Sequence, residues 1–276
     1  MQEQGKQLRD SVLSRAAREP LIMGILNVTP DSFSDGGRNF APEAALAEAL
    51  KMRSDGADII DVGGESTRPG ASSVSLTDEL VRVERIISGI CETAVTPVSI
   101  DTYKAGVARA AAAAGAVIVN DVWGMTRDPD MAQAIADTDC AAVITYNRGE
   151  VDGTINLVDD MRAFFNRSLA TADGVKIPRK HLILDPGLGF GKTYEQNFEA
   201  LARLDVLQDY RLPILVGVSR KSFIGRVLDR PVDDRLVGTL AANLVALTKG
   251  AAILRVHDVA EHRQAVTVFG AIGDRR

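Results

Sequence analysis

Three side chains that suit the binding of a polar ring stand at or near the ends of short apolar runs. Asp101, Asn120 and Asp185 each follow a stretch of aliphatic residues. The carboxylates accept hydrogen bonds, and the amide both donates and accepts them. This set matches the edge of a flat heterocycle that carries amino and oxo groups.

Cationic groups gather at two further runs. Arg255 and His257 lie two positions apart, so on a strand both point to the same face and form an anion clamp. Lys221 follows another run and adds a second cation. Asn27 closes the first run, and its amide oxygen suits a hard cation such as Mg2+. Together these residues predict a heterocyclic substrate with an anionic leaving group.

Polar residues at strand ends have a structural explanation one by one, because Asp and Asn favour turns and helix caps. Seven of the eight runs end this way, however, and burying so many polar groups at one place is costly without a ligand. The long loops 27–38 and 63–73 are rich in Gly, Ser and Pro, and we expect them to contact substrate. They contain Phe33, Asp35, Thr67, Arg68 and Pro69.

Eight apolar runs alternate with Ala-rich and charge-rich helical stretches. This alternation and the length of 276 residues predict a single-domain (β/α)8 barrel, the TIM-barrel class of α/β fold. An open doubly wound sheet is the alternative, although no dinucleotide glycine fingerprint follows the first run. We expect residues 1–20 to be an N-terminal extension and 21–276 the barrel. The predicted strands are 21–28, 58–62, 97–101, 117–122, 141–146, 181–185, 213–218 and 252–257, and the predicted helices are 41–56, 76–93, 104–115, 129–138, 157–173, 194–209, 233–249 and 259–269.

The composition is that of an ordinary folded protein. Hydrophobic residues make up 46% and charged residues 25%, which excludes bulk disorder. The net charge of −5 argues against a nucleic-acid partner, and no apolar run approaches the ~20 residues of a membrane span. We therefore expect a cytoplasmic protein. Two cysteines and three histidines form no disulfide framework or zinc pattern, and we expect His181 and His262 at the surface or in capping positions.

Seven segments appear in the order and spacing of one family. The sequence resembles the dihydropteroate synthase family, a pterin-binding family of folate biosynthesis, over about residues 21–269. The matching segments are IMGILNVTPDSFSDGG (22–37), ADIIDVGGESTRPGA (57–71), VSIDT (98–102), NDVWG (120–124), DPGLGFGKT (185–193), LVGVSRKSFIG (215–225) and RVHDV (255–259).

The resemblance implies a reaction and a set of partners. Such enzymes condense 6-hydroxymethyl-7,8-dihydropterin diphosphate with 4-aminobenzoate, release pyrophosphate and use Mg2+. Sulfonamides compete with 4-aminobenzoate, and the enzymes are commonly homodimers that meet through their late helices. The reaction is dissociative: the bond to diphosphate breaks first, and the amine then attacks a cationic methylene carbon.

The resemblance also assigns roles to residues of this chain. Pterin binding falls to Asp101, Asn120, Asp185 and Lys221. Diphosphate binding falls to Asn27, Arg68, Arg255 and His257, with Asn27 as the metal ligand. The 4-aminobenzoate pocket takes Phe33, Thr67, Arg68, Pro69, Phe190, Lys221 and Ser222. The catalytic set is Asp35, Asp101, Asp185, Lys221, Arg255 and His257.

One position departs from the family. Members carry Met-His-Met at the end of the fifth strand, and the first Met packs on the pterin. Here Thr145, Tyr146 and Asn147 take those places. Two alternatives therefore accompany the synthase prediction: a pterin-binding paralogue without synthase activity, and a pterin-dependent methyltransferase barrel.

Overall fold

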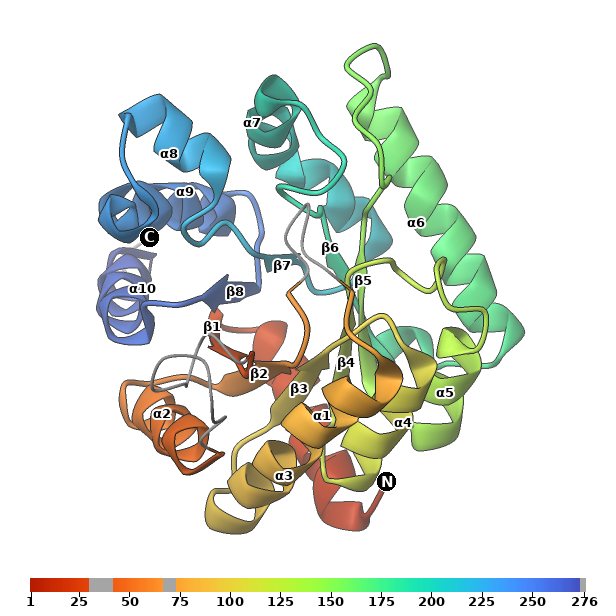
Figure 1. The fold of residues 1–276 in the computed structure, drawn as a ribbon. Coiled ribbons are helices and arrows are strands. Elements are labelled where there is room, and N and C mark those ends of the chain that lie inside the picture. The colour runs from red at the N-terminus through yellow and green to blue at the C-terminus, as the bar shows by residue number, and fades with distance from the viewer. Residues whose placement is uncertain (30–41, 67–72, 274–276) are drawn as a thin grey trace.

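The described residues of this computed structural model, 1–29, 42–66 and 73–273, form eight parallel strands in a ring (Figure 1). Hydrogen-bonded neighbours run in the order β6-β5-β4-β3-β2-β1-β8-β7. A parallel bridge between Leu184 and Ile214 joins β6 to β7 and completes the circuit. The predicted (β/α)8 barrel is thus confirmed. The strands are β1 (Leu21–Asn27), β2 (Ile59–Gly63), β3 (Val98–Asp101), β4 (Ile118–Asp121), β5 (Ala141–Thr145), β6 (Leu182–Asp185), β7 (Leu215–Val216) and β8 (Ile253–Val256).

Helices surround the ring and cover the outer faces of the strands (Figure 1). The strands are buried on both faces, which explains their continuous apolar character. The helices are α1 (Glu3–Ala16), α2 (Pro42–Ser54), α3 (Leu76–Thr93), α4 (Ala105–Ala113), α5 (Met131–Thr138), α6 (Leu157–Gly174), α7 (Tyr194–Ala202), α8 (Ser222–Leu228), α9 (Leu236–Thr248) and α10 (Val259–Gly273), with short 3₁₀ turns η1 (Arg179–His181), η2 (Leu204–Tyr210) and η3 (Val232–Asp234).

Side chains inside the ring change from apolar to polar along each strand. A lower layer is hydrophobic and includes Ile59, Ile118, Val143, Ile183 and Ile253. Because side chains on a strand alternate between faces, the residue two positions later points inward as well. At those later positions stand Asp61, Asn120, Thr145, Asp185 and Arg255. The alternation therefore places a polar layer on an apolar floor, at the carboxyl ends of the strands.

Two helix predictions were wrong. The predicted helix 194–209 ends at Ala202, and the chain continues as the 3₁₀ turn η2. Leu204 and Leu207 are buried there, three positions apart, a spacing that matches the three residues per turn of a 3₁₀ helix. Helix α8 was not predicted, because it has only seven residues and Gly225 at its centre weakens the helical signal.

The two histidines expected at the surface or in capping positions are buried. His181 and His262 are 3% and 1% exposed. The Nδ1 atom of His262 lies 2.6 Å from the Asp258 carbonyl oxygen, so the first turn of α10 holds this ring in the interior.

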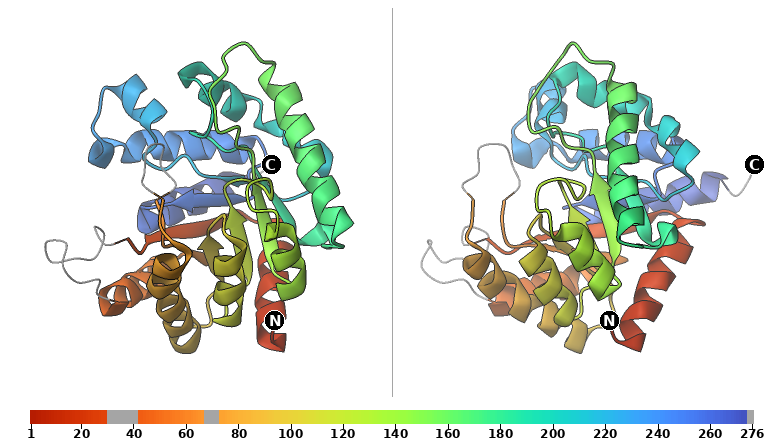
Figure 2. Two further views of the ribbon diagram at one scale, coloured as in Figure 1. Left: turned by 45° about the vertical axis from the view of Figure 1, so that its right-hand side comes forward. Right: turned by 90° about the vertical axis from the view of Figure 1, so that its right-hand side faces the viewer.

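The N-terminal extension is helical and packs beneath the barrel. Val12 and Ala16 of α1 are buried in one cluster with Leu21, Met23 and Ile118 from the starts of the strands. Figure 2 shows α1 lying across this end of the ring. Helix α1 thus closes the floor below the polar layer. None of the helices in the described ranges combines the length and the apolar character that crossing a membrane requires.

Replacing Val12 by Ala should lower the free energy of unfolding by about 2 kcal/mol, because two methyl groups leave a packed floor. Urea denaturation measures this change. Ser11→Ala, on the exposed side of the same helix, is the control and should leave stability nearly unchanged. Equal effects of the two substitutions would show that α1 does not close the barrel.

Candidate active site

A cavity of about 340 Å³ opens at the carboxyl ends of the strands. It brings together every predicted site residue that lies within the described ranges. These are Asn27, Asp101, Asn120, Asp185, Phe190, Lys221, Ser222, Arg255 and His257. The other five predicted residues, Phe33, Asp35, Thr67, Arg68 and Pro69, lie outside the described residues.

A buried ion triad stands at the base of this cavity. The Arg255 guanidinium donates from Nε to Asp61 Oδ2 and from Nη2 to Asp101 Oδ2, each at 2.6 Å. Asn120 Nδ2 donates to the same Asp61 oxygen at 3.1 Å. The side chain of Asp61 is fully buried. The triad therefore ties β2, β3 and β8 together through their side chains, and Asn120 adds β4.

Asp61 lies within the predicted strand 58–62, but no role was predicted for it from the sequence. Its position in the strand could have revealed it. Asp61 lies two positions after the inward-facing Ile59, so its side chain also points into the barrel. Asp61 binds Arg255 and Asn120, two residues predicted to contact substrate. Asp61 therefore fixes the orientation of both side chains.

Burial dominates the electrostatics of the triad. It raises the pKa of Asp101 to about 7, although the neighbouring Arg255 charge opposes the shift. Burial also disfavours the Arg255 cation, but the Asp61 and Asp101 carboxylates outweigh this and raise its pKa. Arg255 therefore stays charged, and Asp101 gains a proton more easily than an exposed carboxyl group does.

A second pair of opposite charges lies across the cavity. Burial raises the pKa of Asp185, and the Lys221 cation opposes the shift. Asp185 Oδ1 accepts a hydrogen bond of 2.7 Å from the Gly187 amide. Burial lowers the pKa of Lys221 to about 8. The Lys221 ammonium donates to the Leu188 carbonyl and lies 4.5 Å from the centre of the Phe190 ring.

Residues after β7 orient the cations at the rim. Ser219 Oγ lies 2.9 Å from Nδ1 of His257 and accepts a 3.2 Å hydrogen bond from the His257 amide. Arg220 also lines the cavity and forms a two-point pair with Asp258 at 3.1 and 2.5 Å. These contacts fix the start of α10 against the loop that carries Lys221.

The loop after β6 is held by a buried amine. Lys192 Nζ donates to the carbonyls of Gly187 and Phe190 at 2.7 and 3.2 Å, and it lies 4.2 Å from the centre of the Tyr146 ring. Burial lowers its pKa to about 7. The segment GFGKT resembles part of a phosphate loop, yet this amine faces carbonyl oxygens. Its role is to hold Phe190 at the cavity.

The three residues that depart from the family pattern have separate environments. Tyr146 points outward and donates to Asp160 of α6 at 2.6 Å. Asn147 Nδ2 donates to the Val122 carbonyl at 3.0 Å and so links the loops after β4 and β5. Thr145 points inward and lines the cavity. Only this first position reaches the candidate site.

Asn27 offers an oxygen ligand of the kind that Mg2+ prefers. If Gly63 carried a Cβ atom, Asn27 Oδ1 and Asp101 Oδ2 would each lie 3.8 Å from it, so glycine leaves this corner open. Among the described residues no cluster of three or more His, Cys, Asp or Glu could hold a metal. This corner therefore offers one amide oxygen of the type that Mg2+ accepts, and an ion bound there would take its remaining ligands from outside these side chains.

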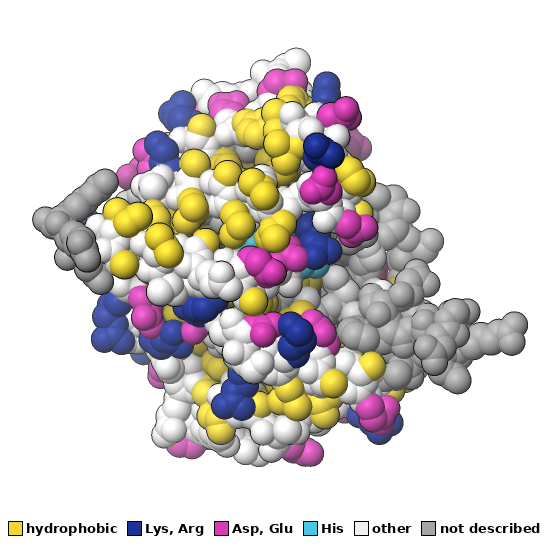
Figure 3. All heavy atoms as spheres, turned by 90° about the vertical axis from the view of Figure 1, so that its left-hand side faces the viewer, with side chains coloured by type: hydrophobic (Ala, Val, Ile, Leu, Met, Phe, Trp, Pro, Cys, Tyr) yellow, Lys and Arg dark blue, Asp and Glu magenta, His cyan; other side chains and the backbone are white. Residues whose placement is uncertain are grey.

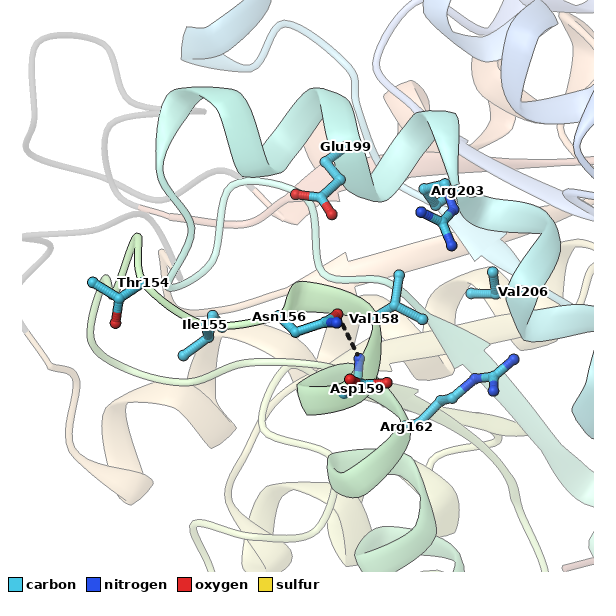
Figure 4. Close-up of a pocket in the computed structure, with 9 residues that line it drawn as sticks. All are labelled: Thr154, Ile155, Asn156, Val158, Asp159, Arg162, Glu199, Arg203 and Val206. Atoms are coloured by element: carbon cyan, nitrogen blue, oxygen red, sulfur yellow. Dashed lines mark hydrogen bonds between the residues drawn. The ribbon is translucent and has the colours of Figure 1, made fainter.

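A second groove of about 570 Å³ lies outside the barrel, between the start of α6 on one side and α7 with η2 on the other (Figure 4). Arg162 pairs there with Asp209 at 2.6 Å, and Asn156 caps α6 by accepting from the Asp159 amide. None of the predicted site residues that the structure describes lines this groove. Its charged side chains are solvent-exposed, so it is not the candidate active site.

The fold and the cavity define a class of protein. It is a (β/α)8-barrel enzyme whose strand-end site combines hydrogen-bonding groups for a polar ring with cations for an anion. Residues 23–257 match the family model of pterin binding enzymes, and the chain belongs to this family.

Relatives with assigned functions cover nearly the whole chain. The dihydropteroate synthase of Bacillus subtilis is 46% identical over 91% of this chain and 88% of its own length. A Clostridium difficile dihydropteroate synthase structure, determined with pteroic acid, is 44% identical with a TM-score of 0.90, covering 93% of this chain and 97% of its own. A Yersinia pestis dihydropteroate synthase structure with a sulfonamide is 40% identical, with a TM-score of 0.88 and coverages of 95% and 96%.

Replacing Arg255 by Ala should destabilise the fold by about 3–5 kcal/mol at pH 8, because it leaves the Asp61 and Asp101 carboxylates buried without their cation. A carboxyl whose pKa is raised in the folded state binds more protons than in the unfolded state, so stability falls as pH rises through that range. The loss should therefore be smaller at pH 5.5. Urea denaturation at both pH values measures it.

Asp61→Asn combined with Arg255→Ala is the matched control, because it removes one of the two stranded charges. The double variant should regain part of the stability lost at pH 8. A loss under about 1 kcal/mol in Arg255→Ala, the same at both pH values, would show that the triad is not a buried charge cluster.

Proposed function

We propose that this protein catalyses the dihydropteroate synthase reaction, the condensation of 6-hydroxymethyl-7,8-dihydropterin diphosphate with 4-aminobenzoate to 7,8-dihydropteroate and pyrophosphate. One observation carries the proposal. Ring-binding groups (Asp101, Asn120, Asp185) and anion-binding groups (Lys221, Arg255, His257) line a single cavity. The synthase relative from Bacillus subtilis shares 46% of its residues over 91% of this chain.

The pterin ring lies, in this proposal, on the apolar floor between Asp101, Asn120 and Asp185. Asp101 Oδ1 is buried and makes no hydrogen bond within the described chain, so it is available to the amino edge of the ring. Asn120 keeps its amide oriented through Asp61, and Lys221 approaches from the opposite side.

The diphosphate then lies toward Arg255, His257 and Lys221, with Arg68 as a further contact. Arg255 donates two of its N–H groups to the Asp61 and Asp101 carboxylates, and its remaining N–H groups are left for phosphate oxygens. The carbon–oxygen bond breaks, and the electron pair leaves with pyrophosphate, whose charge these cations stabilise. The Asp101 and Asp185 carboxylates, together with Asp35, stabilise the cationic methylene carbon that remains.

The 4-aminobenzoate amine attacks this carbon and loses a proton. We place this substrate beside Phe190, Lys221 and Ser222, which lie at the rim of the cavity. Phe33, Thr67, Arg68 and Pro69 complete the proposed pocket, where sulfonamides compete. Positioning and charge stabilisation suffice for such a reaction, so no covalent enzyme intermediate is needed.

Mg2+ is proposed as the cofactor, with Asn27 as its protein ligand. When bound, the ion neutralises charge on the departing diphosphate. The diphosphate substrate is itself multiply charged and does not cross a bilayer unaided. We therefore propose that the reaction takes place in the cytoplasm, where such phosphorylated intermediates are kept.

Release of pyrophosphate tests the function. Purified protein with both substrates and Mg2+ should release one pyrophosphate for each dihydropteroate formed. EDTA should abolish turnover and excess Mg2+ restore it. Protein that binds the pterin yet releases no pyrophosphate would instead be the paralogue without synthase activity, and methyl transfer would indicate the methyltransferase. Neither alternative is favoured by the relatives, which are dihydropteroate synthases at 41–46% identity.

The late helices support the expected homodimer. Helix α9 has the sequence LVGTLAANLVALT, without a single charged residue, and Val237 and Val245 on it are exposed. Val268 and Ile272 of α10 are exposed nearby. Figure 3 shows hydrophobic side chains spread over this face of the molecule. An apolar outer helix face of this kind is typical of an interface, and we propose a second copy of the chain as its partner.

Replacing Val237 by Asp should convert the dimer to a monomer, because Val237 is 79% exposed on α9 and a charge there would be buried on association. Light scattering after size-exclusion chromatography measures the mass. Val81→Asp, an equally exposed valine (72%) on α3, is the control and should leave the dimer intact. A wild-type protein of monomer mass at micromolar concentration would contradict the proposal.

A further inference from the structure

Thr145 carries a hydroxyl group without a partner at the end of β5. Its side chain is 1% exposed, and Oγ1 makes no hydrogen bond within the part of the chain that the structure describes. The residue lines the cavity. Burying an unpaired hydroxyl costs free energy, and the cost is recovered when a ligand supplies the partner.

The methyl group of Thr145 contacts the loop after β6. Gly187 packs against the side chain so closely that an added Cβ there would lie 3.2 Å from Thr145 Cγ2. The same glycine has a φ of +62°, and its added Cβ would collide with the Tyr146 carbonyl, which keeps this contact in place. The methyl group of Thr145 thus lies against Gly187.

The neighbours of Thr145 define what the hydroxyl would meet. In the sheet it is the register partner of Asp185, and Asn120 stands on the adjacent strand β4. All three line the same cavity. A hydroxyl both donates and accepts, so it complements a carboxylate and an amide around a ring that carries both kinds of group.

We infer that Thr145 Oγ1 hydrogen-bonds the polar edge of the pterin ring and is a specificity-determining residue of this chain. The inference rests on the proposed function, because the ring is the pterin of that reaction. The resemblance implies that a methionine packs on the pterin at this position in the family, and in this chain the position would supply a polar contact instead.

Two substitutions separate the hydroxyl from the methyl group. Thr145→Val keeps the branched shape and removes the hydroxyl, whereas Thr145→Ser keeps the hydroxyl and removes the methyl. Calorimetry with 6-hydroxymethyl-7,8-dihydropterin diphosphate should show about fivefold weaker binding by the valine variant, the effect of one hydrogen bond. The serine variant should bind more tightly than the valine variant. Both variants should need the same 4-aminobenzoate concentration for half-maximal rate as the unaltered protein.

Two results would overturn the inference. One is a valine variant that binds the pterin as tightly as the unaltered protein, with an unchanged melting temperature. The other is a serine variant that loses as much affinity as the valine variant, which assigns the effect to packing. Calorimetry needs no turnover, so a protein that binds the pterin without releasing pyrophosphate would refute the proposed function and leave this inference to be judged on binding alone.

Discussion

The Arg255 guanidinium between Asp61 and Asp101 is the constraint on which the barrel mouth depends. Two buried carboxylates and a guanidinium that is only 19% exposed are costly to desolvate, and their close hydrogen bonds offset this cost. The contacts join β2, β3 and β8, whose bonded residues lie up to 194 positions apart. Asn120 joins through Asp61. One interaction thereby fixes the orientation of the Asp101 carboxylate, the Asn120 amide and the Arg255 cation together.

The opposite wall depends on a loop rather than on strand ends. Gly187 turns the chain after β6 with a positive φ and lies against the Tyr146 carbonyl, where no side chain would fit. Lys192 then holds this loop by donating hydrogen bonds to two of its carbonyl groups. Lys221 faces the same loop from the cavity. Two lysines thus have different tasks: Lys192 is enclosed by protein, and Lys221 faces the site.

The sequence predicted the barrel and the membership of the site because both follow from periodicity. Parallel strands bring their carboxyl ends to one edge, so residues such as Asp101 and Asp185 must meet there once the strands are placed. Pairing among those residues could not be predicted. Whether Asp61 binds Arg255 depends on strand tilt and side-chain reach, which a one-dimensional pattern does not contain. Helix α8 was missed for a local reason. Glycine lowers the helix propensity of this segment, but at position 225 it leaves the space that the Arg235 side chain fills.

Strand alternation also explains how β5 accommodates Thr145, Tyr146 and Asn147 without loss of the site. Tyr146 faces α6, where Phe164 and Phe165 pack on its ring and Asp160 accepts a hydrogen bond from its hydroxyl group. The Asn147 side chain hydrogen-bonds the backbone of the loops after β4 and β5. Because neighbouring residues on a strand point to opposite faces, changes at 146 act on the helix layer and changes at 145 act on the cavity. Of the three side chains, only that of Thr145 therefore lines the cavity, which it shares with Asn120 and Asp185.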